Sequence, residues 1–243
     1  MKVKIIGYGW VGKAMHTLFP DAVIQKRGKK KEKCDVAFIC VPTPLKDKKL
    51  DCSIVEQVIK DCEEDLIIVR STVMPGFCDS LNKNVCFVPE YLGETINHPM
   101  TNQHIRQFLI IGGTPENRRK AIEVFQEAYN ANVSIRQVSN YEAEVIKLSE
   151  NRAIAFKLSE IDELYNVCEA AKIDYYIIRD AVYGDDPRFN LWWTFIYPDK
   201  RGFHNSKCLK KDVEAWCSWA ESLGYTPEIT KLIVERSKQY ALH

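Results

Sequence analysis

The sequence predicts an α/β protein, in which a doubly wound parallel sheet is followed by an all-α domain with one long helix. Three observations predict this fold. Short apolar runs alternate with helical patterns in the first half, and a glycine-rich turn follows the first of these runs. In the second half, the stretch from Tyr141 to Lys172 contains neither proline nor glycine. Repeated strand-then-helix order is typical of a sheet with crossover helices on both faces.

Each expected strand of the first half is a short apolar run bounded by polar or turn residues. The runs are Val3–Ile6, Ala22–Gln25, Asp35–Val41, Leu66–Val69, Val85–Val88 and Phe108–Ile111. The run at 35–41 is apolar almost without a break, which suits a central parallel strand that is buried on both faces. A helical pattern continues from the glycine turn to about Leu18, and Ser53–Cys62 is a second helix with Asp51 or Ser53 as its cap.

The second half is predicted to be helical. Apolar residues recur at helical spacing from Tyr141 to about Lys172, so we expect one helix of roughly thirty residues there, longer than most globular helices. Such a helix usually bridges domains or forms an oligomer interface. Shorter helices are expected at Tyr175–Val182, Leu209–Leu223 and Pro227–Tyr240. We place the domain boundary near Ser139, with one domain over residues 1–138 and the helical domain over 139–243.

Composition excludes several classes of partner. The 243 residues carry a formal net charge of +1, so no global field selects nucleic acid or an anionic membrane. No apolar run approaches the roughly 20 residues that span a bilayer, and the first run is too short for a signal peptide. We therefore expect a cytoplasmic protein with no membrane partner. Nine cysteines without a CxxC pair predict neither a disulfide framework nor a metal site.

The glycine turn has the spacing of a dinucleotide fingerprint, Gly7-x-Gly9-x-x-Gly12 with Trp10 and Val11 inside it. It follows an expected strand and opens an expected helix, which is the context that a Rossmann-type domain requires. Gly7 permits the tight turn, Gly9 lets a pyrophosphate approach the backbone, and Gly12 allows close packing of helix and strand. The alternative is a glycine-rich turn without a ligand.

The end of the second strand departs from the rule for NAD. An acidic residue about 20 residues after the fingerprint normally holds the ribose hydroxyls, but this sequence has Gln25-Lys26-Arg27. Lys26 and Arg27 would attract a 2′-phosphate. The hypothesis is that the cofactor is NADP, or that the preference for NAD is relaxed. The alternative is that the lysine-rich turn is simply solvated.

Further motifs follow the fingerprint in a fixed order along nearly the whole chain. They are Val41-Pro42-Thr43-Pro44, Leu50-Asp51-Cys52-Ser53, Ser71-Thr72-Val73-Met74-Pro75-Gly76, Pro89-Glu90-Tyr91-Leu92-Gly93-Glu94, Lys147-x3-Asn151, Asp162-Glu163, Asp186-Pro187-Arg188 and Cys208-Leu209-Lys210-Lys211-Asp212. With these motifs, the sequence resembles the nucleotide-sugar dehydrogenases, the family of UDP-glucose 6-dehydrogenase and UDP-N-acetylmannosamine dehydrogenase.

The resemblance implies a four-electron oxidation of a primary alcohol on a nucleotide sugar, with NAD as the usual cofactor. By position, Cys208 would be the nucleophile that forms a thioester, and Lys147 would stabilise the oxyanion at the reacting carbon. Asn151 would position the sugar, Asp212 would hold a water or share in proton transfer, and Glu90 would act as general base or acid in thioester cleavage.

The resemblance also implies residues at the cofactor and the substrate. The cofactor side would include Val41, Pro42, Thr43, Ser71, Thr72 and Glu94. The substrate side would include Lys147, Asn151, Arg188 and Lys211. In the family the arginine that matches Arg188 reaches a neighbouring subunit's site, so a homodimer is expected, with the long helix 141–172 as its interface.

Each of these residues also has a structural interpretation. Cys208 could be an ordinary thiol, Lys147 and Asn151 solvated helix positions, and Arg188 one half of a surface ion pair with Asp186. The aromatic cluster at 192–197 is better explained by packing than by stacking on a substrate.

The sequence departs from the family pattern before the cysteine and at its end. His204 and Asn205 replace glycines in the loop that wraps the sugar, and the chain ends at His243 without the domain that grips uridine diphosphate. Two alternatives therefore stay open. One is a two-electron β-hydroxyacid dehydrogenase, which needs no cysteine. The other is a dinucleotide-binding dimer without turnover.

Overall fold

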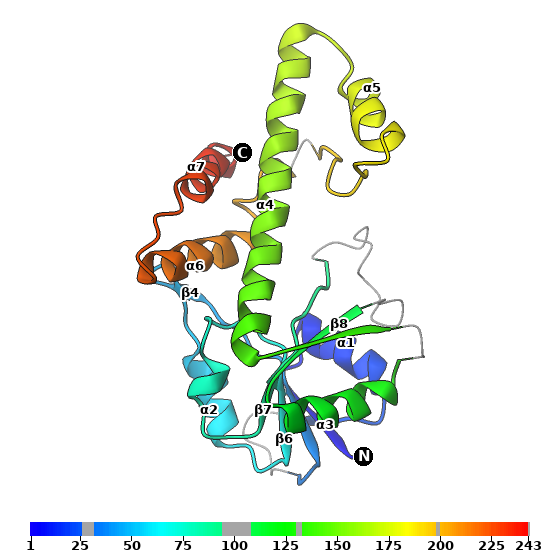
Figure 1. Ribbon diagram of the computed structural model, residues 1–243, viewed down its shortest axis with the longest axis vertical. Helices are drawn as coiled ribbons and strands as arrows, with labels where there is room; N and C mark the ends of the chain where they lie inside the picture. The colour runs from blue at the N-terminus through cyan, green and yellow to red at the C-terminus, as the bar shows by residue number, and fades with distance from the viewer. Residues whose placement is uncertain (26–31, 94–107, 130–132, 198–199, 243) are drawn as a thin grey trace. The chain divides into compact units, whose positions relative to one another are not determined.

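A computed structural model describes residues 1–25, 32–93, 108–129, 133–197 and 200–242. The chain divides into two compact units, Met1–Lys147 and Leu148–His243 (Figure 1). The predicted boundary near Ser139 lies directly before the long helix α4 (Asn140–Ala171), whereas the two units divide within that helix.

The first unit contains a parallel sheet with helices on both faces. The strands of the described part are β1 (Val3–Ile6), β2 (Val23–Gln25), β3 (Val36–Ile39), β4 (Leu45–Lys46), β5 (Lys49–Leu50), β6 (Leu66–Val69), β7 (Val85–Phe87), β8 (Phe108–Gly112) and β9 (Ser134–Val138). Five of them form one sheet in the order β2-β1-β3-β6-β7, and every neighbouring pair in it is parallel. The predicted doubly wound parallel sheet is therefore confirmed.

Alternation along the central strand β3 explains why its sequence is apolar throughout. Val36 and Phe38 join the core beneath helices α1 (Trp10–Leu18) and α3 (Pro115–Gln126). Ala37 and Ile39 join a second core on the opposite face, beneath helix α2 (Ser53–Lys60) and the first turn of α4. Successive side chains of a strand point to opposite faces, so a strand covered on both sides must be apolar at every position.

Several elements of the first unit were not predicted, among them strands β4, β5 and β9 and helix α3. Strand β9 has the sequence SIRQV and is only half-buried, so it gives neither an apolar run nor a clean alternation. It pairs in parallel with β8, apart from the five-stranded sheet. Strands β4 and β5 form a hairpin whose turn residues, Asp47 and Lys48, have positive φ. Helix α3 is capped by Thr114, the residue before its first turn, whose hydroxyl accepts from the Asn117 N–H at 3.3 Å.

The predicted long helix is confirmed as α4, within one residue at each end. Its start is a capping box, in which the Ser139 N–H donates to the Glu142 carboxylate at 2.8 Å and the Glu142 N–H donates to the Ser139 hydroxyl at 3.2 Å. Its end coincides with Lys172, whose φ of 58° is left-handed and cannot continue a helix.

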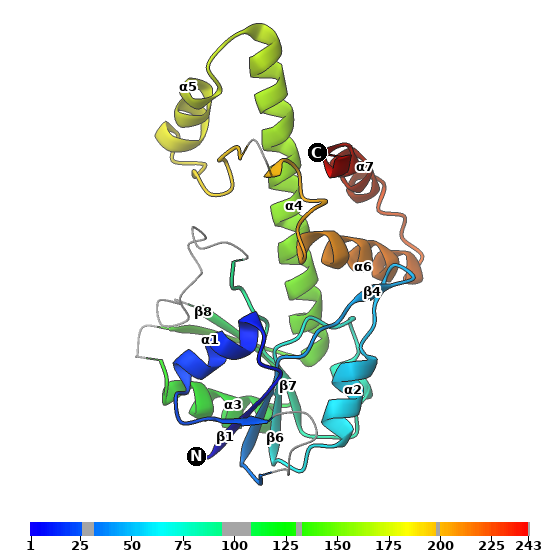
Figure 2. The same ribbon diagram turned by 180° about the vertical axis from the view of Figure 1, so that it is seen from behind.

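The second unit packs shorter helices around its part of α4. They are α5 (Tyr175–Arg179), the π-helical turn η3 (Asp180–Asp185), α6 (Leu209–Ser222), α7 (Glu228–Ser237) and the 3₁₀ turn η5 (Lys238–Leu242). Ala155 of α4 packs with Phe203, with Val213 of α6 and with Ile233 of α7. Ile161 and Cys168 pack with Tyr175 and Tyr183 of the α5–η3 segment. The two groups lie on opposite sides of α4 (Figures 1 and 2).

Candidate active site

The glycine turn after β1 has the backbone that the fingerprint predicts. Gly7 has a φ of 94°, and a Cβ there would lie 2.4 Å from the Cys40 carbonyl oxygen. A Cβ at Gly12 would lie 1.9 Å from the Gly7 carbonyl oxygen, so both positions exclude any side chain. A Cβ at Gly9 would meet nothing within 4 Å. The middle glycine therefore faces open space, where a pyrophosphate can approach the backbone.

Helix α1 begins at Trp10, directly after this open space, and no side chain caps its first N–H groups. Such a helix start attracts an anion through its backbone N–H groups and its dipole. The Trp10 indole Nε1 donates to the Gly93 carbonyl at 3.1 Å, and Val11 packs against the core under α1. Of the predicted cofactor residues, Lys26, Arg27 and Glu94 lie outside the described residues.

The loops that follow β3 and β6 are joined to each other by hydroxyl groups. Thr43 Oγ1 donates to the Thr72 carbonyl at 2.7 Å, and Ser71 Oγ donates to the Val41 carbonyl at 2.6 Å. Because β3 and β6 are parallel neighbours, both loops leave the same edge of the sheet as the glycine turn. The structure thus brings the predicted cofactor residues at 41–43 and 71–72 together at one sheet edge, where open α/β folds bind ligands.

A buried ion pair lies behind this edge. Arg70 at the end of β6 is 1% exposed, and its guanidinium pairs with the Glu90 carboxylate and donates to the Val88 carbonyl at 2.9 Å. The other Glu90 oxygen accepts from the N–H groups of Tyr91 and Leu92 at 2.7 and 2.9 Å. Both oxygens of Glu90 therefore accept hydrogen bonds within the first unit.

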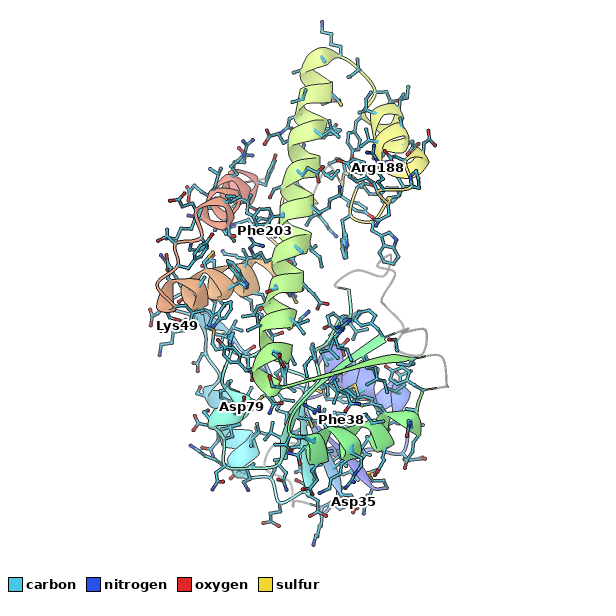
Figure 3. All side chains as sticks on the ribbon, in the orientation of Figure 1. Asp35, Phe38, Lys49, Asp79, Arg188 and Phe203 are labelled. Atoms are coloured by element: carbon cyan, nitrogen blue, oxygen red, sulfur yellow. The ribbon has the colours of Figure 1, made fainter. Side chains whose placement is uncertain are left out.

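The first two turns of α4 fasten the helix to the first unit. The Asn140 amide oxygen accepts from the Phe87 N–H at 2.8 Å, and its Nδ2 donates to Asp79 at 3.0 Å (Asp79 is labelled in Figure 3). The fully buried Glu144 carboxylate accepts from the N–H groups of Gly76 and Cys78 at 2.5 and 2.9 Å. Burial raises the pKa of Glu144 to about 7, against the opposing effect of these bonds.

Lys147 is the last residue of the first unit and is 7% exposed. Its ammonium lies 5.0 Å from the centre of the Tyr91 ring, on the turn that Glu90 holds. A cation at this distance over an aromatic face is stabilised by the ring. Lys147 is therefore a buried, aromatic-bound ammonium rather than a solvated helix residue.

The second unit brings together three other predicted residues. The buried Asp212 carboxylate in the first turn of α6 accepts from the Asn151 amide at 2.6 Å and from the Lys211 ammonium at 2.7 Å. Cys208 is exposed and lies one turn earlier, where the Asp212 N–H donates to its carbonyl at 3.0 Å. Cys208 is the N-cap residue of α6, at the positive end of the helix dipole.

The loop before Cys208 is tied down by side chains. Asp162 of α4 accepts from Arg201 and from the Gly202 N–H at 2.8 Å, and the Phe203 N–H donates to Ser237 at 3.0 Å. Phe203 itself is buried (Figure 3). His204 lies 3.1 Å from the Lys210 ammonium, and burial together with this charge lowers the pKa of His204, which favours the neutral ring.

Arg188 belongs to the second unit, as Asp212 does, but lies apart from the Asp212 cluster (Figure 3). It is an exposed residue of the segment after η3 and pairs with Asp186 through two of its nitrogens (Figure 3). Bonds from Arg188 lower the pKa of Asp186. This arrangement is the surface ion pair of the structural interpretation. A role of Arg188 towards another subunit stays a prediction.

The described part of the chain gives no sign of a metal centre or a membrane span. No group of three or more His, Cys, Asp or Glu side chains among the described residues could hold a metal ion. None of the helices that the structure describes is long and apolar enough to cross a bilayer.

Two family models match the chain. The model of the UDP-glucose/GDP-mannose dehydrogenase family, NAD binding domain, matches residues 22–131, and the model of the central domain of the same family matches residues 141–238. Together they cover most of the sequence. The chain belongs to the UDP-glucose/GDP-mannose dehydrogenase family.

Individual relatives of this family agree with the match. UDP-glucose 6-dehydrogenase TuaD of Bacillus subtilis is 27% identical over 229 residues, which are 86% of this chain and 47% of that protein. A UDP-glucose dehydrogenase of Pyrobaculum islandicum shares the fold with a TM-score of 0.79 at 21% identity, over 98% of this chain and 68% of the other. The chain spans about half the length of the curated relatives that it matches.

The fold also extends beyond the UDP-glucose/GDP-mannose dehydrogenase family. A 3-hydroxyisobutyrate dehydrogenase of Mycobacterium tuberculosis has a TM-score of 0.72 at 14% identity, over 99% of this chain and 93% of the other. At this identity the likeness concerns the fold alone. The two-electron alternative therefore has to be separated from the family reaction by chemistry.

Sequence reasoning missed three polar residues of the site, the buried Arg70 and Glu144 and the half-buried Tyr91. Arg70 lies between a buried strand and the Ser71-Thr72 motif. A charged residue at the carboxyl end of a parallel strand indicates a site residue, because open α/β sheets bind ligands at that edge. Glu144 precedes Lys147 by three positions and so shares its helix face. Tyr91 lies within the motif Pro89-Glu90-Tyr91-Leu92-Gly93-Glu94, but no sequence pattern indicates that it contacts Lys147.

Proposed function

We propose that this chain oxidises the primary alcohol of a nucleotide sugar to a carboxylate through a thioester on Cys208. Membership of the UDP-glucose/GDP-mannose dehydrogenase family supports the substrate class. The observation that carries the proposal is the constellation on the second unit, an exposed Cys208 at the start of α6 with Asp212 bound to Asn151 and Lys211 behind it. A two-electron dehydrogenase needs no cysteine at this place.

The proposed reaction balances over two oxidations. The alcohol carbon loses a hydride and its oxygen loses a proton, which gives an aldehyde. The Cys208 thiolate adds to the aldehyde carbon, and loss of a second hydride from the resulting thiohemiacetal gives the thioester. Water then cleaves the carbon–sulfur bond, which releases the carboxylate and regenerates the thiol. One alcohol thus yields two hydrides, and a bound nicotinamide supplies the acceptor for each.

The position of Cys208 suits a nucleophile. The start of α6 presents the positive end of the helix dipole, and Lys207, Lys210 and Lys211 surround the residue in sequence. Both features place positive charge near the sulfur. Exposure gives the sulfur access to a substrate carbon, which the buried cysteines of the chain do not have.

The other residues act through charge and hydrogen bonds. Lys147 supplies a cation for the oxyanion that develops at the reacting carbon, an effect worth several kcal/mol in a preorganised site. Asn151 and Lys211 donate to Asp212, and Asp212 in turn positions water or a proton. Glu90 acts as general base or acid in cleavage of the thioester.

The cofactor would be held by the first unit. Gly9 and the start of α1 would receive the pyrophosphate, and the loops at 41–43 and 71–72 would flank the nicotinamide half. Strand β2 ends at the uncharged Gln25, which supports NADP or a relaxed preference. Turnover with NAD and with NADP at equal concentration tests this. A strong preference for NAD contradicts it.

A homodimer is part of the proposal. Apolar residues such as Val167 on α4 and Ile177 on α5 are more than half exposed in the single chain. A second copy that covers the α4 face would bury them. Light scattering should give twice the chain mass, and the chain mass alone contradicts the dimer.

The decisive experiment supplies UDP-glucose, GDP-mannose and N-acetylated relatives with NAD or NADP, and counts reduced cofactor per carboxylate formed. The thioester route predicts a ratio near two because two hydrides leave one carbon. An aldehyde product with a ratio of one supports the two-electron alternative. Cofactor binding without any reduction supports the dinucleotide-binding dimer.

A further inference from the structure

Lys147 is a long, flexible side chain whose placement needs an explanation. Four rotatable bonds separate its ammonium from the helix backbone, and fixing them has an entropic cost. A cation stabilises a developing oxyanion only if it is already in position when the charge appears. The residues that hold the ammonium therefore matter as much as the lysine itself.

One contact of this ammonium is the face of Tyr91. The Lys147 Nζ lies 5.0 Å from the ring centre, within the distance at which an aromatic face attracts an ammonium. Lys147 is 7% exposed, so water screens this attraction weakly. The ring is held in turn by Phe108, whose centre is 5.0 Å away at an interplanar angle of 50°.

The backbone under Tyr91 is fixed by a charged group. One oxygen of Glu90 accepts from the N–H of Tyr91 and from the N–H of Leu92, at 2.7 and 2.9 Å, and so closes a tight turn on itself. The second oxygen pairs with Arg70. Three donors therefore hold one carboxylate at the base of the ring.

Arg70 connects this turn to the sheet. Its guanidinium is fully buried, donates to the Val88 carbonyl at 2.9 Å and lies 5.9 Å from the centre of the Phe125 ring in the core beneath α3. A buried ion pair that is also hydrogen-bonded resists displacement, because breaking it leaves an uncompensated charge. The turn at 90–92 is thus rigidly attached to the end of β6.

We propose that Tyr91 is the positioning residue for Lys147, and that the buried Arg70–Glu90 pair fixes Tyr91 for this role. The proposal rests on the proposed function in one respect, the oxyanion role of Lys147. The ring contributes nothing to the reacting atoms directly. It sets where the ammonium lies before the substrate carbon becomes charged.

Kinetics of Tyr91→Leu and Tyr91→Phe test the proposal. Leucine removes the aromatic face, and phenylalanine keeps it without the hydroxyl. Tyr91→Leu should lower kcat about tenfold and leave KM for the nucleotide sugar and for the cofactor unchanged. Loss of the ring contact raises the activation free energy by about 1.4 kcal/mol, because the ammonium is no longer held in place. Tyr91→Phe should stay within about twofold of the wild type. Equal loss in both variants, or a loss that appears in KM alone, overturns the proposal.

A double-mutant cycle in folding tests the same contact without any turnover. The cycle comprises the wild type, Tyr91→Leu, Lys147→Met and the double variant, each unfolded in urea. We expect a coupling of about tenfold in the unfolding equilibrium constant. Additivity within about twofold overturns the proposal.

Repeating the cycle in a Glu90→Gln background tests the part played by the ion pair. Loss of the carboxylate charge releases the turn, so the coupling between Tyr91 and Lys147 should fall to within about twofold. An unchanged tenfold coupling refutes the role of the Arg70–Glu90 pair. If the wild type oxidises no nucleotide sugar, the proposed function fails, and the cycles still decide whether Tyr91 seats Lys147.

Discussion

The start and the inner face of helix α6 each carry a cysteine, and the two thiols have opposite environments. Cys208 is exposed at the N-cap, at the positive end of the helix, with lysines on both sides in sequence. Cys217 is buried, and burial together with the nearby Glu221 raises its pKa to about 11. One helix thus contains a thiol placed for reaction and a thiol placed for packing.

This difference shows that burial decides whether a polar group of this chain is accessible for reaction. Burial favours the neutral form of both Cys217 and Glu144. The buried Asp212 carboxylate, in contrast, pairs with the Lys211 ammonium at 2.7 Å. Each prediction below changes one side of this comparison.

The largest effect is expected from Cys208→Ala. Without the sulfur no thiohemiacetal or thioester forms, so carboxylate formation should fall by at least about 10³-fold, as for other residues that form covalent intermediates. Product analysis after incubation with a nucleotide sugar and cofactor measures this loss.

Cys217→Ala is the matched control on the same helix. It should retain carboxylate formation within about twofold and lose about 1 kcal/mol of stability, because it removes only a buried sulfur. Equal activity of the two variants would remove Cys208 from the mechanism.

The second effect concerns the buried Glu144. Its pKa is about 7 in the folded chain and 4.5 in the reference state, so the folded chain favours the protonated form. The stability from this group is fully present below about pH 4.5 and is lost as the pH rises through about 7. The loss is up to about 3 kcal/mol, from 1.36 kcal/mol per pKa unit.

Urea unfolding of the wild type and of Glu144→Gln between pH 4.5 and 8 measures this dependence. The difference in unfolding free energy between them should shift by up to about 3 kcal/mol in favour of the variant as the pH rises. Asp79 faces Glu144 and adds to the rise in its pKa. Parallel curves for the two proteins would contradict the assignment.

A smaller effect is expected from Asp212→Ala. The change removes the acceptor that the buried Asn151 amide shares with the partly buried Lys211 ammonium, which costs about 2 kcal/mol. Chemical denaturation measures it. Asp186→Ala removes a half-buried carboxylate whose basic partner, Arg188, is exposed, and should leave stability unchanged. Equal losses in both variants would show that burial is not the cause.

The sequence alone predicted those parts of the molecule that depend on backbone. Glycines 7, 9 and 12 are restricted or open as the fingerprint requires, because steric contact with main-chain atoms leaves no choice of residue. The long α4 was predicted because thirty positions of helical periodicity outweigh local ambiguity. Strand β9 was missed because its sequence has no apolar run or alternation. It is a strand because it pairs with β8.

Side-chain partners were beyond the reach of sequence. The Asn151–Asp212 bond joins residues from α4 and α6, and the Arg70–Glu90 pair joins the ends of two strands. Such pairs depend on the packing of elements that are distant in the chain. Lys147 belongs to the first unit and Cys208 to the second, so their meeting at one substrate carbon stays a prediction.

The most direct test of the central claim is the mass of the peptide that contains Cys208. The protein is mixed with a nucleotide sugar that it oxidises and with cofactor, quenched in acid during turnover, digested and measured by mass spectrometry. The thioester mechanism predicts an acyl group on Cys208 that appears only when both the nucleotide sugar and the cofactor are present. An unmodified Cys208 peptide while carboxylate accumulates would contradict it.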